Sequence, residues 1–345
     1  MPYVQFMVKA VEFGLLEGPI RDPYMPERSR AVAAWDLLIN SRMVGLGNVG
    51  LDTVPGIPNA KVQRGTVERH LRYNVVGWRP KNRAVAIARH AAYSAFCYTV
   101  IDMMYQLLPR LHPVFRQPHG GAHVLPTFAN SGLRLLPGVL DIPFPPFAVV
   151  MLVQAGMGLT IWMIFEGLFQ LFAVIHLLLG WPVEAWDVNM FGSVWRADSL
   201  IDLWGTRWHQ TFRHMFIVCS IVLLNALRVP ITSANVFMAT FFFSGVIHVV
   251  PQLTMDPVGS PAGIMIFFLA AGAGCALEVM FKRATGRKVH GVWGQIWTWT
   301  YMGVWGTLVA HAWLEAGFGG NVFTSPGGPG DYVAQFIAKY VVSTQ

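Results

Sequence analysis

Residues 199–210, Ser-Leu-Ile-Asp-Leu-Trp-Gly-Thr-Arg-Trp-His-Gln, and residues 241–248, Phe-Phe-Phe-Ser-Gly-Val-Ile-His, are the two most informative stretches of this chain. Each carries a histidine, His209 or His248, inside or beside a long apolar run. A histidine in such surroundings is either hydrogen-bonded to a partner or kept there for chemistry. About forty residues separate the two, roughly one transmembrane hairpin, and this spacing can bring both imidazoles to one buried site.

The composition around these motifs indicates an integral membrane protein. Of the 345 residues, 54% are hydrophobic and 12% are charged, whereas a soluble protein has about 25% charged residues. The net charge of +7 is concentrated in residues 1–90, which hold +6 of it. No basic stripe, zinc knuckle or aromatic RNP motif supports nucleic-acid binding. We therefore expect a multi-pass protein of the endoplasmic reticulum, with the lipid bilayer as a partner and the basic N-terminal region in the cytosol.

Apolar runs of the length of a bilayer span predict the helices. A first candidate covers residues 91–108. The run at 145–181 contains one charge, Glu166, and is too long for one straight helix, so we expect two packed helices or one span plus a re-entrant piece. Further candidates cover residues 212–229, 233–251, 262–281 and 290–314. The prediction is an all-α integral membrane protein with about seven transmembrane or re-entrant helices around a buried two-histidine site.

Composition also divides the chain into three parts. Residues 1–90 form a basic region that is cytosolic or lies at the membrane surface, residues 91–318 form the multi-span domain, and residues 319–345 form a linker and a short amphipathic tail. Residues 30–40 have helical spacing with a charged side, which fits a helix on the membrane surface or one packed on the rest of the protein. The three cysteines lie in apolar stretches and predict free thiols rather than a disulfide framework.

The first motif has the features of a helix start. Ser199, or the aspartate before it, can cap a helix that begins here. On such a helix Trp204 and Trp208 are i,i+4 neighbours that form one aromatic face, and His209 is a neighbour of Arg213 in the same way. The residue types alone also fit an interfacial helix with a tryptophan belt.

The second motif combines a histidine with two small residues. Ser244 and Gly245 lie four and three residues before His248, on the same face of a helix. Small residues there clear space beside the imidazole, as a substrate channel requires. The alternative is a neutral histidine that is hydrogen-bonded across helices, the usual fate of a lone histidine in an apolar core.

The order Ser-Leu-x-Asp-x-Trp-Gly-x-x-Trp-His-Gln, followed by the histidine of the second motif, resembles the membrane-bound O-acyltransferases, and among them the wax-synthase-like branch common in fungal metabolite clusters. The resemblance covers about residues 25–315 and is specific at the two motifs. The chain departs from it at Val249, where many members have glutamate. The partner that would orient the imidazole of His248 is therefore left open.

The resemblance implies an acyl-CoA-dependent O-acyltransferase that moves acetyl from acetyl-CoA to a hydroxyl of a terpenoid or polyketide, a small hydrophobic alcohol. It implies His248 as the catalytic base and His209 as a second catalytic residue that polarises the carbonyl or positions a substrate. The residues expected to line the substrate site are Trp204, Trp208, Ser244 and Gly245. The expected partners of the CoA phosphates, or else membrane anchors, are Arg207, Arg213, Lys282, Arg283 and Arg287. We expect acyl-CoA as a co-substrate, no bound cofactor and no metal.

Other functions stay open. A long-chain wax-ester synthase would differ from such an acetyltransferase only in its acyl donor. A non-catalytic membrane protein could keep the same fold. A membrane prenyltransferase or terpene cyclase would use Asp198-Ser-Leu-Ile-Asp202 to hold Mg²⁺ and diphosphate, although the sequence has no second motif of this kind. His119-Gly-Gly-Ala-His123 has the spacing of di-iron desaturases, but the further histidine boxes that these enzymes need are missing from the sequence.

Overall fold

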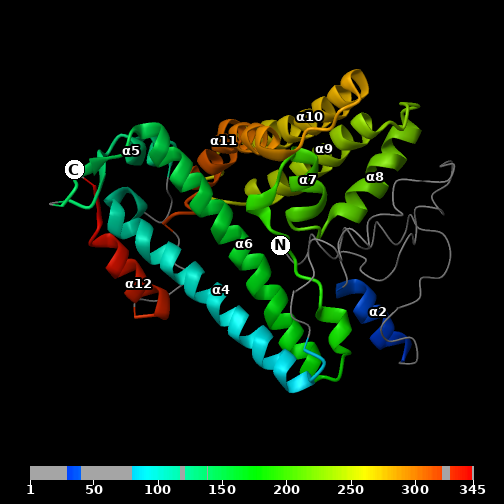
Figure 1. Ribbon diagram of the computed structural model, residues 1–345, viewed down its shortest axis with the longest axis horizontal. Coiled ribbons are helices and arrows are strands. Elements are labelled where there is room, and N and C mark those ends of the chain that lie inside the picture. The colour runs from blue at the N-terminus through cyan, green and yellow to red at the C-terminus, as the bar shows by residue number, and fades with distance from the viewer. Residues whose placement is uncertain (1–28, 40–79, 117–120, 138, 321–326, 344–345) are drawn as a thin grey trace. The chain divides into compact units, whose positions relative to one another are not determined.

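A computed structural model describes residues 29–39, 80–116, 121–137, 139–320 and 327–343 (Figure 1). Four of the helices in these ranges are long and apolar enough to cross a membrane: α4 (Arg83–Leu111), α6 (Pro146–Leu178), α9 (Ser233–Gln252) and α10 (Pro261–Thr285). They confirm the prediction of a mostly helical, membrane-spanning chain. The other helices are α2 (Arg30–Ile39), η1 (Pro113–Arg116), α5 (Val124–Ala129), η2 (Val183–Trp186), η3 (Val194–Arg196), α7 (Leu200–Asp202), the π-helix η4 (Leu203–Arg207), α8 (Arg213–Ala226), α11 (Gly291–Glu315) and α12 (Pro329–Ala338).

With four candidate spans in the described ranges, the expected number of about seven transmembrane or re-entrant helices is not confirmed. Residues 145–181 do not split, because α6 runs unbroken for 33 residues and its only proline stands at the helix start. At about 1.5 Å per residue it is about 50 Å long, well beyond the hydrocarbon core of a bilayer. The 14 residues of α8 are too few for a span, and α11 has the length but is rich in tryptophan, glycine and threonine.

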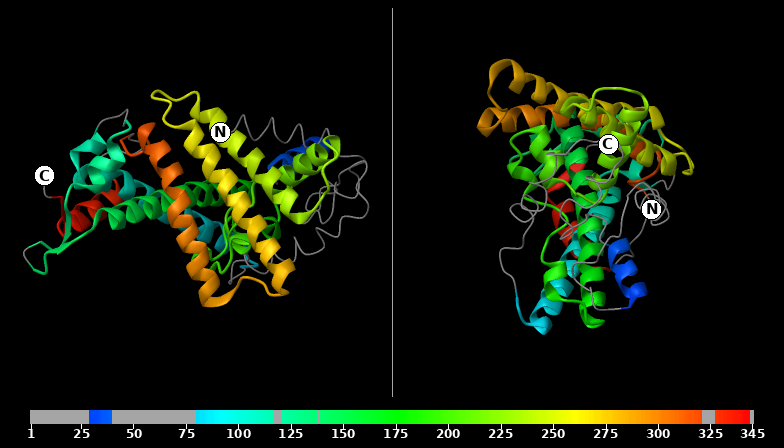
Figure 2. Two further views of the ribbon diagram at one scale, coloured as in Figure 1. Left: turned by 90° about the horizontal axis from the view of Figure 1, so that it is seen from above. Right: turned by 90° about the vertical axis from the view of Figure 1, so that its right-hand side faces the viewer.

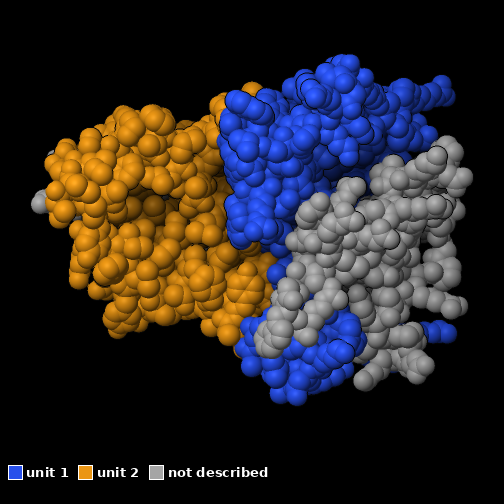
Figure 3. All heavy atoms as spheres, viewed as in Figure 1, with its two compact units in different colours: residues 1–89, 172–247, 268–299 blue, residues 90–171, 248–267, 300–345 orange. Residues whose placement is uncertain are grey.

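Contacts between residues group the chain into two compact units (Figure 3). The first unit comprises residues 1–89, 172–247 and 268–299, and the second comprises residues 90–171, 248–267 and 300–345. Most of residues 1–90, together with 321–326 of the linker, lies outside the described ranges. The domain boundaries at residues 90 and 318 therefore stay a prediction.

In the first unit, α2 packs on the end of α6. The Trp35 indole N–H donates to His176 Nε2 at 3.0 Å, and the Trp181 indole N–H donates to the Asp36 carboxylate at 2.5 Å. Asp36 and His176 are 4% and 2% exposed. Of the two interpretations open for residues 30–40, the structure therefore favours a helix packed on the rest of the protein.

In the second unit, α4 and α6 run side by side (Figure 1). The Ser94 hydroxyl donates to the Gly167 carbonyl at 3.2 Å, and the Gln170 amide donates to Glu166 at 2.7 Å. Beyond these helices, an apolar core forms around Phe115 and Phe128, whose ring centroids lie 4.8 Å apart. This core fixes the Pro-rich segment that precedes α6.

The all-α prediction is wrong in one respect, because the second unit contains a small sheet. Strands β1 (Leu133–Leu135), β2 (Ile142–Pro143) and β3 (Val341–Ser343) form it in the order β2-β1-β3, with both pairings antiparallel. Leu135 pairs with Ile142 on one side and with Val341 on the other. The C-terminal tail thus returns to pair with the Pro-rich segment.

Helix α12, in the predicted tail, docks on α4 through a close approach of the two backbones. The Gly330 amide donates to Asp102 Oδ2 at 2.8 Å, and Arg110 forms an ion pair with Asp331 at 2.5 Å. A Cβ atom on Gly330 would lie 2.1 Å from the Met103 backbone nitrogen. Only glycine therefore fits at this position.

We predict that Gly330→Ala lowers the stability of the protein by about 1–3 kcal/mol, since the added methyl group must push two backbones apart. The measurement is thermal unfolding in detergent. Gly158→Ala in α6 is the matched control, because a Cβ atom there meets nothing within 4 Å. Equal unfolding temperatures for the two variants would contradict the proposed packing of α12.

Candidate active site

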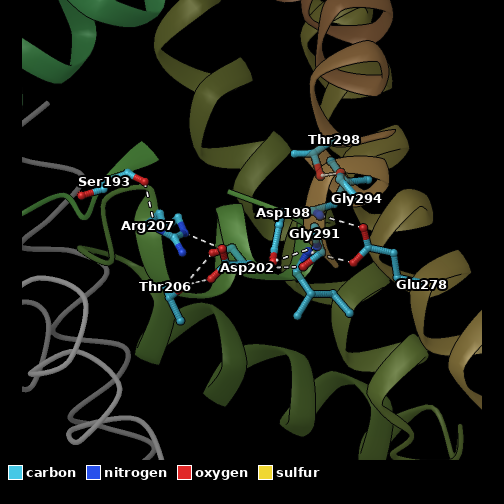
Figure 4. Close-up of polar contacts among 12 residues, drawn as sticks. Ser193, Asp198, Asp202, Thr206, Arg207, Glu278, Gly291, Gly294 and Thr298 are labelled. Carbon is cyan, nitrogen blue, oxygen red and sulfur yellow. Dashed lines mark hydrogen bonds and ion pairs between the residues drawn. The ribbon is translucent and has the colours of Figure 1, made fainter. Parts of the chain in front are cut away.

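The first motif begins at a helix start inside the first unit, and Figure 4 shows the polar contacts around it. The Ser199 side chain accepts from the Asp202 amide at 2.9 Å, which confirms the predicted cap. The next two amides, of Leu200 and Ile201, donate to the carboxylate of Glu278 in α10 at 2.7 and 3.1 Å. The Trp297 indole of α11 donates to the same carboxylate at 2.9 Å. One acidic side chain, 5% exposed, thus joins the motif to two helices.

The start of α11 also holds the motif. The Gly291 amide donates to Asp198 Oδ2 at 3.2 Å (Figure 4). A Cβ atom on Gly294 would lie 2.0 Å from the Asp198 carbonyl oxygen, so glycine is required where α11 passes the motif. Helices α10 and α11 are joined by five residues and form a hairpin (Figure 2). The motif therefore rests against the connected ends of this hairpin.

After the first turn the motif changes from α-helix to π-helix. The Trp208 amide bonds to the Leu203 carbonyl, five residues back, at 2.7 Å. This repeat brings Asp202 and Arg207 onto one face, where they form an ion pair. Arg207 also donates to the Ser193 carbonyl at 2.9 Å, and the Thr206 hydroxyl donates to Asp202 Oδ1 at 2.7 Å (Figure 4). Single π-turns of this kind occur frequently at functional sites.

His209 lies beyond the π-helix, in chain without regular secondary structure. The expectation that His209 and Arg213 are helical i,i+4 neighbours is therefore wrong, because α8 begins only at Arg213. The imidazole is half-buried among the rings of Phe191 and Trp208, with centroid distances of 5.7 and 5.8 Å. Gln210, 1% exposed, fixes the chain on the other side by donating to the carbonyls of residues 204 and 208 at 2.9 and 2.6 Å.

The two motifs meet within the first unit. The ring of Trp204 contacts the ring of Phe241, the first residue of the second motif, edge to face at 5.6 Å. Trp204 and Trp208 contact each other at 5.9 Å, edge to face rather than as a stacked pair. A Cβ atom on Gly272 of α10 would lie 3.0 Å from Phe241 Cβ, so this glycine lets α10 come close to the second motif. Trp204, Trp208 and Phe241 thus form one aromatic cluster.

His248 lies on α9 within the second unit, whereas His209 belongs to the first. The side chain of His248 is half-buried, not fully buried as hydropathy had indicated. On the preceding turn, Ser244 is half-buried and Gly245 is buried. The joint two-histidine site remains a prediction.

The five predicted cationic residues fall into three settings. Arg207, 9% exposed, is engaged by Asp202 and the Ser193 carbonyl. Arg213 is half-buried at the start of α8. The remaining three, Lys282, Arg283 and Arg287, are exposed where α10 leads into α11.

Glu278 and Gln210 are the two residues that sequence reasoning missed. A signal was available for Glu278, because it is the one acidic residue in the apolar helix α10, and charged residues inside a span usually have a specific role. No comparable signal marked Gln210, whose contacts depend on the non-helical chain around His209. Both residues hold the motif in place through backbone groups.

The described residues contain no group of three or more His, Cys, Asp or Glu that could hold a metal ion. His119 of the His-x-x-x-His pattern lies outside the described ranges, and His123 is exposed at the start of α5. Cys97, Cys219 and Cys275 are not in disulfides, as predicted.

Comparison with known proteins places both motifs in one family match. The model of the membrane bound O-acyl transferase family matches residues 186–270, a range that contains His209 and His248. The resemblance that the two motifs indicate is therefore confirmed over this segment.

Individual relatives are fungal acetyltransferases. The acetyltransferase spyB of Aspergillus fumigatus is 29% identical over 154 residues, which cover 38% of this chain and 26% of spyB. The acetyltransferase pyr8 of the same species is 32% identical over 127 residues, 33% of this chain and 29% of pyr8. The acetyltransferase aurG of Calcarisporium arbuscula is 24% identical over 247 residues, 69% of this chain and 57% of aurG. The chain thus matches between about a quarter and somewhat over half of the length of these relatives.

We predict that Arg207→Met destabilises the protein by about 3 kcal/mol, because it leaves the Asp202 carboxylate largely buried without its cation. The double variant Asp202→Asn/Arg207→Met removes both charges and should cost less than the single substitution. Thermal unfolding of the two single variants and the double variant in detergent measures the coupling between the two residues. Additive effects would show that the ion pair does not hold the π-helix.

Proposed function

We propose that this chain is a membrane-bound O-acyltransferase that moves an acetyl group from acetyl-CoA to a hydroxyl of a small hydrophobic alcohol, of the terpenoid or polyketide type. The observation that carries the proposal is the family match over residues 186–270, because it contains both histidine motifs. The acetyltransferase names of the relatives support acetyl as the group transferred. A location in the endoplasmic reticulum is part of the same proposal.

The proposed acyl transfer needs a general base for the hydroxyl and a hydrogen-bond donor to the developing oxyanion. The hydroxyl oxygen attacks the thioester carbonyl carbon, the hydroxyl proton passes to His248, and the carbon–sulfur bond breaks to release the CoA thiolate. A neutral imidazole near pH 7 suits the base. Because the thioester is already activated, no acyl-enzyme intermediate is required. Ser244 and Gly245, one turn before His248, would leave room for the alcohol.

His209 would polarise the thioester carbonyl or position a substrate. Its half-buried ring among Phe191 and Trp208 supports this role, because an aromatic surround keeps water from a donor group. The cluster of Trp204 and Phe241 would continue this apolar lining toward the acceptor alcohol.

The CoA phosphates would bind at the cationic connection between α10 and α11. Lys282, Arg283 and Arg287 are exposed there, and no carboxylate within the described residues forms an ion pair with them. Arg213, at the start of α8, is a further candidate. Arg207 is less suited, because its guanidinium already holds the π-helix through Asp202.

The contacts of Asp198 and Asp202 weigh against the prenyl-diphosphate alternative. Asp198 accepts from the start of α11, while Asp202 is paired with Arg207 and Thr206. Carboxylates engaged in this way would have to leave their partners before they could hold Mg²⁺.

Product mass tests the proposal directly. Membranes containing the full chain are incubated with acetyl-CoA or a long-chain acyl-CoA and a panel of terpenoid and polyketide alcohols, with and without EDTA. We expect a mass gain of one acetyl group that survives chelation. Transfer of only the long chain would favour a wax-ester synthase, and a loss of product that Mg²⁺ restores would favour the prenyl-diphosphate alternative.

We predict that His248→Ala lowers turnover by about 10²- to 10⁴-fold, the usual loss when a general base is removed. The measurement is ester formation in membranes at equal expression. His123→Ala, at an exposed histidine of α5, is the control and should keep wild-type turnover. Retention of more than about a tenth of the activity in His248→Ala would exclude this residue as the base.

For His209 we predict a milder loss with His209→Asn than with His209→Ala. An asparagine amide can still donate a hydrogen bond where the imidazole N–H did, but it cannot act as a base. Initial rates with both substrates saturating measure the difference. Equal damage from the two substitutions would mean that His209 titrates during turnover or is needed for packing.

A further inference from the structure

The turn between β1 and β2 carries exposed aliphatic side chains. Val139 and Leu140 are 79% and 64% exposed, and Ile142, at the start of β2, is exposed as well. We call these three residues the apolar tip. The hairpin belongs to the second unit and projects from its sheet (Figure 2). Neighbouring exposed aliphatic side chains on a turn indicate a surface that contacts something other than water.

The backbone amides of this turn are satisfied within the turn itself. The amides of Val139, Leu140 and Asp141 all donate to the Leu136 carbonyl, at 3.0, 3.1 and 3.0 Å. Leu136 and Asp141 have φ of +53° and +48°, a left-handed conformation that residues other than glycine rarely adopt. Amides that face lipid cannot bond to water, so they need acceptors inside the protein. This turn provides one.

The charges of the hairpin are paired with each other. Arg134 and Asp141 are the only charged residues between positions 133 and 145. The Arg134 guanidinium donates to both carboxylate oxygens of Asp141, at 2.5 and 2.6 Å, and to the Asp141 carbonyl at 3.0 Å. Because this ion pair is bidentate, both charges are neutralised at short range. No charge without a partner in the hairpin therefore opposes contact of the apolar tip with lipid.

The hairpin leads directly into a membrane span. Helix α6 begins at Pro146, and its first charged residue is Glu166. The uncharged residues 146–165 make a helix about 30 Å long, which is the thickness of the hydrocarbon core of a bilayer. Phe147, at the start of this stretch, is 71% exposed. The start of α6 is therefore expected at one boundary of the hydrocarbon core, with the hairpin just beyond it.

Aromatic side chains lie beside the base of the turn. The Leu136 amide donates to the Tyr340 carbonyl at 2.7 Å. Tyr340 is exposed, and its ring contacts the exposed ring of Phe336 in α12 at 5.1 Å. Tyrosine is enriched where a membrane protein passes from lipid to water. This pair is consistent with the depth that the length of α6 indicates.

We propose that the apolar tip inserts among the lipid headgroups and upper acyl chains at the start of α6 and anchors this end of the second unit in the bilayer. The occupant is lipid, because the tip continues, through Phe147, the exposed apolar surface of a span. This inference does not depend on the proposed acyl transfer.

The test measures which quencher reaches a fluorescent label on the tip. The full chain carrying Leu140→Cys is labelled with bimane in phosphatidylcholine nanodiscs. One quencher is phosphatidylcholine with a nitroxide on the upper acyl chain, and the other is iodide in the water. Phe147→Cys is the lipid-facing reference, and Lys288→Cys, at an exposed charged residue, is the aqueous reference. The wild-type chain, treated with the same reagent, gives the background from the native cysteines.

We expect the label at residue 140 to be quenched by the nitroxide lipid as strongly as the label at residue 147, and to be shielded from iodide relative to residue 288. Iodide quenching as strong as at residue 288, without quenching by the lipid, would overturn the inference. Shielding from both quenchers would indicate a protein contact, from a second copy or another partner, and would overturn it as well.

A charged tip supplies the second measurement. Val139→Asp/Leu140→Asp is compared with Val139→Ala/Leu140→Ala, each with the label on Ile142→Cys. Because a carboxylate opposes transfer into lipid, the aspartate pair should lose quenching by the nitroxide lipid and gain quenching by iodide, whereas the alanine pair should keep the lipid signal. Unfolding temperatures equal to that of the wild type show that both variants are folded. An aspartate pair with both quenching signals unchanged would contradict the insertion of the tip.

Discussion

The carboxylate of Glu278 is the group on which the arrangement of the first motif depends. It is nearly fully buried in an apolar helix, where an ionisable group is costly unless it is hydrogen-bonded. Two backbone amides at the start of α7 and one indole N–H of α11 satisfy it. These same hydrogen bonds fix where the motif begins. The bonds that satisfy the buried carboxylate therefore also position the motif.

From that fixed start, the backbone of the motif determines where its side chains lie. The π-turn brings Asp202 and Arg207 together, and Gln210 closes the far end by bonding to two carbonyls. His209 then lies in non-helical chain among aromatic rings, and Trp204 contacts the second motif at Phe241. A histidine held in this way has a defined position and few accessible conformations. The proposed role of hydrogen-bond donor to a developing oxyanion requires both.

Local sequence signals predicted the start of the motif but not its later course. Ser199 has the side chain and position of a helix cap, and the structure has that cap. The change to a π-helix at Leu203 moves every later residue off the expected face, and it depends on tertiary partners such as the Ser193 carbonyl. In the same way, hydropathy located α6 but could not tell that one helix would run through, because length alone does not specify a break. The strand at 341–343 pairs with a segment about 200 residues earlier, beyond the reach of local pattern.

The most direct test of this account is acyl-transfer turnover in Glu278→Leu and Glu278→Gln, with Glu184→Leu, at an exposed glutamate, as the control. Leucine removes all three hydrogen bonds, whereas glutamine keeps one acceptor oxygen for the Leu200 amide and the indole. The account predicts that turnover and the unfolding temperature fall in the order wild type, Gln, Leu, with the control unchanged. A leucine variant with wild-type turnover and unfolding temperature would contradict it.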